Sequence, residues 1–407
     1  METAVPGWPE VSYVRAMGTR TMDTPGYLSS EEVSVDDLAA LVATVTPPEN
    51  YPHASTIVHE AVVYDMDVIA DTISTEVGRR EVMAEIAHVL QAGSGIVVLR
   101  GAVATNVLGR ATEAFEAMIA REKAAGGSAG DHFAAAGAND RVWNALEKLA
   151  VADPSVFVDY YASDAIALAS SAWLGPAYQV TSQLNVVNPG GTAQSPHRDY
   201  HLGFMTDEQA GRYPAHVHGL SGGLTLQGAV AHVDMPVESG PTKLLPHSQK
   251  YALGYLAWRR PDVIDFFEEH HVQLPLAAGD AVFFHPALFH AAGTNRTADV
   301  RRMANLIQVS SAMGRSMESV DRERMVRAIY PQLVDRAEIW EPSELANAVS
   351  AAAEGYPFPS NLDRDPPING LAPPSQADLV HRALRERWSS EQLGEALEAL
   401  ATRRQTS

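Results

Sequence analysis

The stretch Phe283–Gln308, FFHPALFHAAGTNRTADVRRMANLIQ, predicts two strands joined by a polar turn. Its first part is apolar and aromatic up to His290, GTNRTAD has the composition of a turn, and a second apolar run follows. The segments 178–191, which ends in Pro-Gly-Gly, and 224–235 have the same strand character. Short strands separated by turns over 178–313, with one helix near 261–270, favour an antiparallel barrel or jelly roll over alternating strand–helix units.

Helical periodicity surrounds this strand-rich middle. Helices are expected at 77–92 and about 155–174 before it, and amphipathic segments follow it toward the C-terminus. We therefore predict an α+β protein in three parts. These are a partly irregular N-terminal arm (1–75), a catalytic jelly-roll domain with supporting helices (76–315) and a C-terminal helical extension (316–407).

Composition narrows the classes of function. The 407 residues carry a net charge of −20, which argues against nucleic acid or an anionic membrane surface as a partner. The chain contains no cysteine, so thiolate metal sites and a cysteine nucleophile are excluded. No apolar run approaches the length that spans a bilayer, and the first residues do not resemble a secretion signal. A soluble, cytoplasmic protein is expected.

The segment SPHRDYHLGF (195–204) contains a candidate for half of a metal site. In an extended chain, residues two apart project to the same side, so His197 and Asp199 can address one centre. Two histidines and one carboxylate on one face of an octahedron suit non-haem Fe(II) and leave three positions open. His290 can supply the second imidazole. Arg301, eleven residues further on, can hold the far end of a dicarboxylate whose near end chelates the metal.

Other residues compete for these roles. A second His-x-Asp pair, His232 and Asp234, lies in the strand-like segment 224–235, and His285 lies five residues before His290. The order His-x-Asp, then about ninety residues of strands, then His and Arg, favours His197, Asp199 and His290.

The sequence resembles the phytanoyl-CoA dioxygenase family of Fe(II)/2-oxoglutarate-dependent oxygenases. Three segments carry the resemblance: AQSPHRDYHLGF, ESGPTKLLPHSQK (238–250) and HAAGTNRTADVRR. The middle segment departs from the family's Pro-Gly-Ser-His, having Pro246-His247-Ser248-Gln249 in its place. Ala292 stands where relatives often have Ser.

The resemblance implies a double-stranded β-helix, a cupin-like jelly roll, with His197, Asp199 and His290 as iron ligands. It implies that Arg301 binds 2-oxoglutarate as co-substrate and that O2 is consumed. The expected reaction is hydroxylation of an aliphatic C–H of a small molecule, with succinate and CO2 as co-products. Because Asp199 is present, oxygenation is favoured over halogenation.

Gln183 and Asn185 are candidates for further contacts to the co-substrate. With Thr181 they alternate along one face of the strand before the metal segment, and relatives use a Gln or Asn from this strand. The segments 124–144 and 200–223 could shape or cover the pocket. The last helix could pack on its own chain or pair two copies into a homo-oligomer. Two alternatives stay open: a cupin-like metalloenzyme that does not use 2-oxoglutarate, and a non-catalytic barrel with a vestigial metal site.

Overall fold

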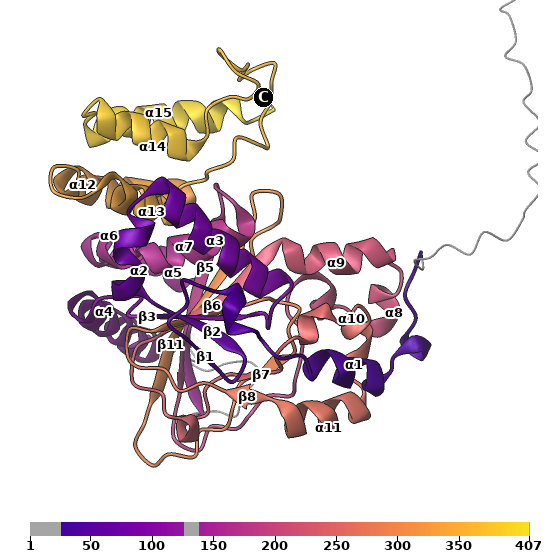
Figure 1. Cartoon of the computed structure of the whole chain (residues 1–407). Coiled ribbons are helices and arrows are strands. Elements are labelled where there is room, and N and C mark those ends of the chain that lie inside the picture. The colour runs from indigo at the N-terminus through magenta and orange to yellow at the C-terminus, as the bar shows by residue number, and fades with distance from the viewer. Residues whose placement is uncertain (1–25, 126–137, 407) are drawn as a thin grey trace, which may run out of the picture.

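The computed structural model describes residues 26–125 and 138–406 of the chain. Within them a large sheet and a small sheet lie among helices (Figure 1). The strands are β1 (Thr56–Val58), β2 (Ala61–Asp65), β3 (Ile96–Arg100), β4 (Asn139–Val142), β5 (Gln179–Val187), β6 (Thr225–Ala231), β7 (Lys243–Leu244), β8 (Val272–Gln273), β9 (Ala281–Phe284), β10 (His290–Ala291) and β11 (Arg302–Ser310).

The large sheet has the order β1-β2-β3-β9-β6-β11-β5-β4, and the small one has the order β10-β7-β8. All pairs are antiparallel except β2 with β3. Apolar side chains of both sheets, such as Val98, Phe284 and Leu244, form one buried cluster, so the two sheets pack face to face. The expected α+β jelly roll is confirmed, although the large sheet is not closed into a barrel.

Helices cover the outer face of the large sheet and its ends. They are α1 (Val35–Val42), α2 (Met66–Ile73), α3 (Glu76–Gln91), α4 (Thr105–Ala124), α5 (Ala145–Ala152), α6 (Pro154–Tyr161), α7 (Asp164–Leu174), α8 (Asp207–Ala210), α9 (Ala215–Gly223), α10 (Gly254–Ala257), α11 (Pro261–His270), α12 (Arg322–Arg336), α13 (Pro342–Ala352), α14 (Gln376–Arg385) and α15 (Ser390–Arg403). Short 3-10 turns are η1 (Ser30–Glu32), η2 (Pro48–Asn50), η3 (His201–Phe204), η4 (Val237–Ser239) and η5 (Ser248–Lys250).

Two hydrophobic clusters anchor these helices. The larger contains apolar residues of α3 to α7 and α12 to α15 together with the outward-facing side chains of the large sheet. A smaller one joins α1, α8, α10 and α11, which Figure 1 shows beside the small sheet. The C-terminal helices α14 and α15 therefore pack on α12 and α13 of their own chain. Oligomer formation through them stays a prediction.

Several segments differ from the sequence-based expectations. Within the expected, partly irregular arm (1–75), β1 and β2 extend the large sheet beside β3. The helix expected at 155–174 is two helices, because Ser163 accepts a hydrogen bond from the Ile166 amide and so begins α7 anew. The connection 200–223 contains η3, α8 and α9. Most of the expected lid segment 124–144 lies outside the described residues, and its last part forms β4.

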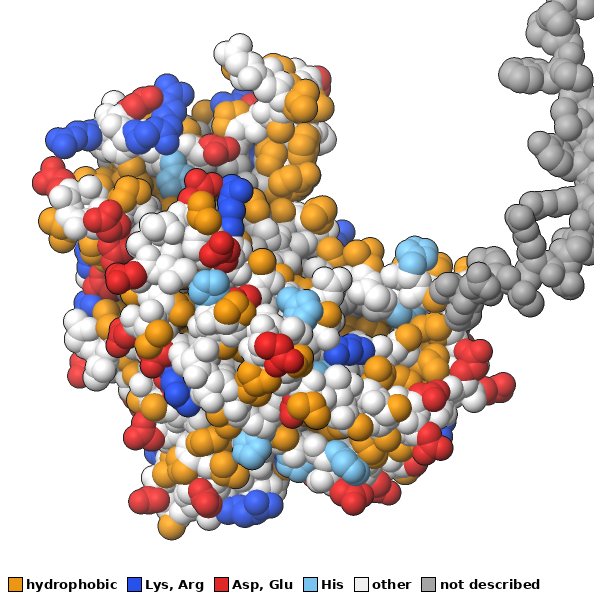
Figure 2. All heavy atoms as spheres, in the orientation of Figure 1, with side chains coloured by type: hydrophobic (Ala, Val, Ile, Leu, Met, Phe, Trp, Pro, Cys, Tyr) orange, Lys and Arg blue, Asp and Glu red, His pale blue; other side chains and the backbone are white. Residues whose placement is uncertain are grey.

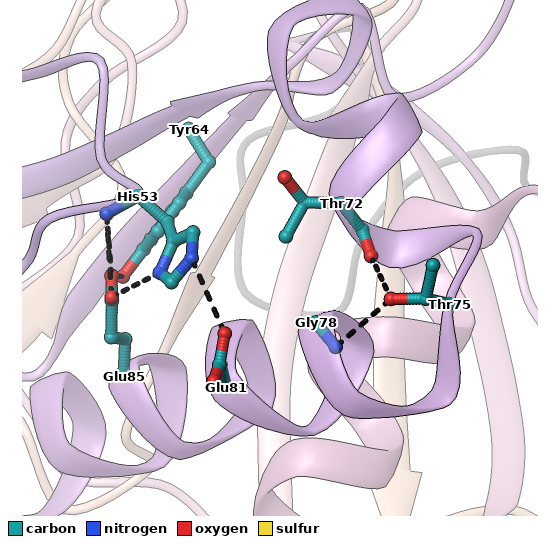
Figure 3. Close-up of polar contacts among 7 residues, drawn as sticks. All are labelled: His53, Tyr64, Thr72, Thr75, Gly78, Glu81 and Glu85. Atoms are coloured by element: carbon teal, nitrogen blue, oxygen red, sulfur yellow. Dashed lines mark hydrogen bonds and ion pairs between the residues drawn. The ribbon is translucent and has the colours of Figure 1, made fainter.

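The start of α3 shows how local contacts fix the position of a helix beside the large sheet (Figure 3). Thr75 caps the helix by accepting from the Gly78 amide at 3.1 Å. A Cβ at Gly78 would lie 2.3 Å from the Thr72 carbonyl oxygen, so only glycine fits this corner. Further along the helix, Glu85 contacts the His53 ring at 2.5 Å and accepts from the Tyr64 hydroxyl at 3.2 Å. These bonds connect α3 to β2 through Tyr64 and to the segment before β1 through His53.

His232 is a core residue on the helix side of the large sheet. Its ring packs against Phe115 and Tyr160, and its nitrogens contact the Thr112 and Tyr160 hydroxyls at 2.8 and 3.1 Å. Burial lowers the pKa of His232 to about 3. The folded chain therefore keeps this ring neutral in mild acid, where the same ring in the unfolded chain takes up a proton.

This difference predicts a pH dependence of stability. The unfolded state binds more protons as the pH falls below about 6.5, so His232 removes up to about 1.4 kcal/mol of stability per pH unit toward acid. Urea unfolding of His232→Gln should show a smaller loss of unfolding free energy between about pH 7.5 and 5 than the wild type. His216→Gln, an exposed position on α9, is the control and should keep the wild-type loss. An equal loss in all three proteins would contradict the assignment.

Candidate metal centre and co-substrate cavity

A backbone pairing brings the three candidate ligands together. The His197 amide donates to the His290 carbonyl at 2.9 Å, and the His290 amide donates to the His197 carbonyl at 3.1 Å. This antiparallel bridge aligns the segment after β5 with β10, across 93 positions of sequence. Asp199 lies one step further, where its amide donates to the Pro286 carbonyl at 3.3 Å.

The side chains converge as the sequence predicted. His290 Nε2 lies 3.3 Å from Asp199 Oδ2, and His197 Nε2 lies 3.7 Å from Asp199 Oδ1. One ligand atom from each residue falls within 4.8 Å of the others. Within the described ranges, no other three His, Asp or Glu side chains meet in this way.

Hydrogen bonds orient both imidazoles. His197 Nδ1 lies 3.0 Å from the Ser195 carbonyl, and His290 Nδ1 lies 2.9 Å from the Leu288 carbonyl. A carbonyl can only accept, so each Nδ1 carries the proton and each Nε2 keeps its lone pair. This is the arrangement that metal-binding histidines adopt. Burial, and then the neighbouring His290, lower the pKa of His197, which favours its neutral form.

Asp199 is held as an anion. Burial by itself would raise its pKa. The His290 and His197 rings, whenever they carry a second proton, and the hydrogen bond from Gln227 outweigh burial and bring the pKa well below its usual range. Two neutral imidazoles and one carboxylate form the donor set that suits a divalent first-row metal.

A cavity of about 670 Å³ opens from this centre. Its largest wall is the inner face of the large sheet, where alternate residues of β5, β6, β9 and β11 point inward. They are Gln183, Asn185 and Val187; Gln227, Ala229 and Ala231; Val282 and Phe284; and Arg302, Ala304, Leu306 and Gln308. Gln183 and Asn185 thus lie where the sequence placed them, and Gln183 accepts from Arg141 at 2.6 Å.

Arg301 does not reach this cavity. Its guanidinium lies outside, 2.9 Å from Glu116 on α4 and 3.6 Å from Asp140, and its side chain is 46% exposed. The neighbouring Arg302 lines the cavity and is 7% exposed. The reason is strand alternation: Arg302 shares its face with Ala304 and Leu306, so Arg301 must point the other way. The structure therefore places Arg302, and not Arg301, in the cavity wall, and a role of either residue toward 2-oxoglutarate stays a prediction.

Arg302 has unused donor capacity. Its Nη1 donates to the Ser239 carbonyl at 2.9 Å and to the Gly293 carbonyl at 3.2 Å. Burial is the sole cause that lowers its pKa, to about 10, so no nearby carboxylate of the described residues compensates its charge. A buried guanidinium without an acidic partner is suited to an anionic ligand in the same cavity.

Arg198, between two of the ligands, is a positioning residue that the sequence did not reveal. Its Nη2 donates to the Ser248 and Tyr251 carbonyls at 2.6 and 2.9 Å, and its guanidinium stacks on Phe289 and Tyr255. Phe289 directly precedes His290. The anchor therefore connects the His197–Asp199 segment, the η5 turn and the third ligand.

The divergent middle motif, residues 246–249, supplies the Ser248 carbonyl to which Arg198 donates. His247 adopts a positive φ of 66°, the left-handed region where relatives have glycine, and Ser248 Oγ accepts from the Phe289 amide at 2.8 Å. Gln249 donates to the Gly93 carbonyl at 3.0 Å. The Ser248 and Gln249 bonds hold this turn, with His247 in the left-handed position.

The competing histidines belong to the scaffold. His232 lies in the helix-side core, and Asp234 accepts from the Ala278 amide at 2.9 Å. His285 packs against Trp173, and burial lowers its pKa to about 3. Neither histidine lines the cavity.

A pair of glycine substitutions tests the Arg198 anchor. A Cβ at Gly254 would lie 1.8 Å from Arg198 Cζ, whereas Gly109 in α4 has no atom within 4 Å of that position. Gly254→Ala should lower the unfolding free energy by about 1–3 kcal/mol or more through overpacking. Gly109→Ala should raise it by about 0.5–1 kcal/mol, because alanine is the better helix residue. Equal stabilities in urea unfolding would refute the close packing of Arg198.

Metal binding is tested by a matched pair of aspartates. Asp199→Ala should weaken Co(II) binding by more than the roughly 10- to 100-fold that follows when only the hydrogen-bond partner of a ligand is removed. Asp234→Ala, in the second His-x-Asp pair, should leave the affinity unchanged. Titration calorimetry on both proteins checks this, and the reverse order of effects would move the metal site to His232 and Asp234.

The fold and the site together define a jelly-roll protein with a His-Asp-His centre beside a buried arginine. The phytanoyl-CoA dioxygenase (PhyH) family model matches residues 93–303, which include β3 to β10 and all three candidate ligands, and the chain belongs to this family. No curated protein matches the chain in sequence.

Several solved structures resemble parts of the chain. The non-heme alpha ketoglutarate dependent epimerase SnoN from nogalamycin biosynthesis is 20% identical over 57% of this chain and 82% of its own, with a TM-score of 0.40. The carbocyclase SnoK from the same biosynthesis is 20% identical over 56% and 83%, also at 0.40. AviO1 from Streptomyces viridochromogenes Tue57 is 18% identical over 56% and 95%, at 0.42. At these TM-scores the likenesses add nothing to the family assignment.

Proposed function

We propose that the chain is an Fe(II)- and 2-oxoglutarate-dependent dioxygenase that hydroxylates an aliphatic C–H of a small molecule. One observation carries the proposal: a His-Asp-His centre and a buried arginine without an acidic partner share one cavity. A dicarboxylate with a 2-oxo acid at one end matches both, because the oxo acid chelates a metal and the far carboxylate pairs with a guanidinium.

The residues present fit iron. His197 and His290 would bind it through Nε2, and Asp199 through a carboxylate oxygen, since Nδ1 of each ring is already committed to a backbone carbonyl. When bound, iron and 2-oxoglutarate supply the activation of O2, with decarboxylation to succinate and CO2 and insertion of one oxygen atom into the C–H bond.

The chain's own contribution is binding, orientation and exclusion of water. Arg302 would orient the co-substrate from the far end, held in place by its bonds to the Ser239 and Gly293 carbonyls. Apolar side chains, including Leu244 of the small sheet, Phe284 of the large sheet and Leu276 between them in sequence, form the walls between these groups. Such walls strengthen the electrostatic contacts and keep water from the reacting carbon.

The remaining cavity surface is suited to a small-molecule substrate. Phe204 and Met317, which are 60% and 39% exposed, and the indole of Trp258 also line the cavity. We place the substrate between these three side chains and the metal centre.

None of the helices in the described part of the chain has the length and apolar character of a membrane-spanning segment.

Adjacent arginines provide the sharpest test of the co-substrate site. Arg302→Ala should raise the KM for 2-oxoglutarate at least about 30-fold, because a lost charge-assisted contact costs roughly 2 kcal/mol or more. Arg301→Ala, which removes the same charge one position away, should stay near the wild-type value. The measurement is CO2 release from labelled 2-oxoglutarate, with Fe(II) and a panel of small metabolites.

Two results would reject the proposal. Release of no CO2 by the iron-loaded wild type under any substrate condition would exclude use of 2-oxoglutarate and favour a cupin-like metalloenzyme of another kind. Loss of co-substrate affinity in Arg301→Ala but not in Arg302→Ala would reject the assigned geometry.

A further inference from the structure

Gln227, in the middle of β6, contacts the metal centre without being a ligand candidate. Its Nε2 donates to Asp199 Oδ2. A carboxylate only accepts hydrogen bonds, so the orientation of the amide is fixed and its Oε1 points away from Asp199. That Oε1 is buried and has no hydrogen-bond partner among the described residues.

An unsatisfied buried carbonyl oxygen is unfavourable for folding. An apolar side chain of similar length, such as methionine, would fill the same space without it. Packing alone therefore does not explain a glutamine here. The hydrogen bond to Asp199 is the interaction that only the amide can supply.

The number of positions around a metal shows what this bond would achieve. An octahedral metal with two imidazoles and one carboxylate oxygen keeps three positions open. A co-substrate that chelates through two atoms, together with O2, needs all three. If Asp199 bound through both oxygens, only two positions would remain.

We propose that Gln227 is the positioning residue that restricts Asp199 to ligation through one oxygen, by occupying Oδ2. This inference rests on the proposed function, because it presupposes a metal at the His-Asp-His centre and a chelating co-substrate. It assigns Gln227 a role toward the metal ligand, distinct from the co-substrate contacts expected of Gln183 and Asn185.

The chain contains a matched control in Gln308. It is the direct cross-strand neighbour of Gln227, on β11, and lines the same cavity. Its Oε1 is also buried without a hydrogen-bond partner among the described residues. The two glutamines therefore share residue type, sheet face and level, but the contact to Asp199 is seen for Gln227.

The experiment compares Gln227→Met with Gln308→Met under anaerobic conditions, using Co(II) as the metal probe. Gln227→Met should bind Co(II) about 10- to 100-fold more weakly, as expected for loss of a partner of a metal ligand. Its visible Co(II) spectrum should change, and the Co(II)-loaded variant should bind 2-oxoglutarate more weakly. Gln308→Met should keep the wild-type Co(II) affinity and spectrum.

Thermal unfolding of the metal-free proteins separates this role from a structural one, because a general packing defect lowers Tm without a selective effect on the metal. Gln227→Asn, whose shorter amide cannot reach Asp199, is a second variant should methionine prevent folding. Wild-type Co(II) affinity and spectrum in a folded Gln227 variant, or equal losses in the Gln227 and Gln308 variants, would overturn the inference alone. Absence of Co(II) binding by the wild type would instead overturn the proposed metal function on which it rests.

Discussion

The pair of backbone hydrogen bonds between His197 and His290 is the constraint on which the site depends. It joins the segment that follows β5 to the small sheet, and it holds the two imidazole rings with their centroids 4.4 Å apart. Asp199, two residues from His197, is then directed at the same centre by the alternation of an extended chain.

Buried cationic charge is the second organising feature. The chain as a whole is strongly acidic, and Figure 2 shows acidic side chains spread over one face of its surface. Yet Arg198 and Arg302 lie in the interior, and burial lowers the pKa of each to about 10, which leaves both charged at neutral pH. Arg198 donates through Nη2 to two carbonyls and lies over two aromatic rings, and Arg302 donates through Nη1 to two other carbonyls. The net charge of the chain therefore does not describe the electrostatic environment of this cavity, which depends on the charged groups that lie close to it.

The two faces of the large sheet divide the tasks of stability and chemistry. On the outer face, residues such as Leu184 and Ile307 join the cluster that holds the helices. On the inner face, the same strands present Gln183, Arg302 and Gln308 to the cavity. A strand can serve both because successive side chains point to opposite faces. For the same reason, a sequence-based prediction that is displaced by one residue places the side chain on the opposite face of the sheet.

The sequence by itself determined the jelly-roll class, the set of three side chains that meet at the His-Asp-His centre and the polar face of β5. These depend on local patterns: strand periodicity, the His-x-Asp spacing and motif order. Only the tertiary structure decided which of Arg301 and Arg302 faces the cavity. It also decided which carbonyls Arg198 binds and that Gln227 donates to Asp199. Each depends on strand register and on partners distant in the chain, and spacing along one segment carries no information about which face it turns toward the cavity.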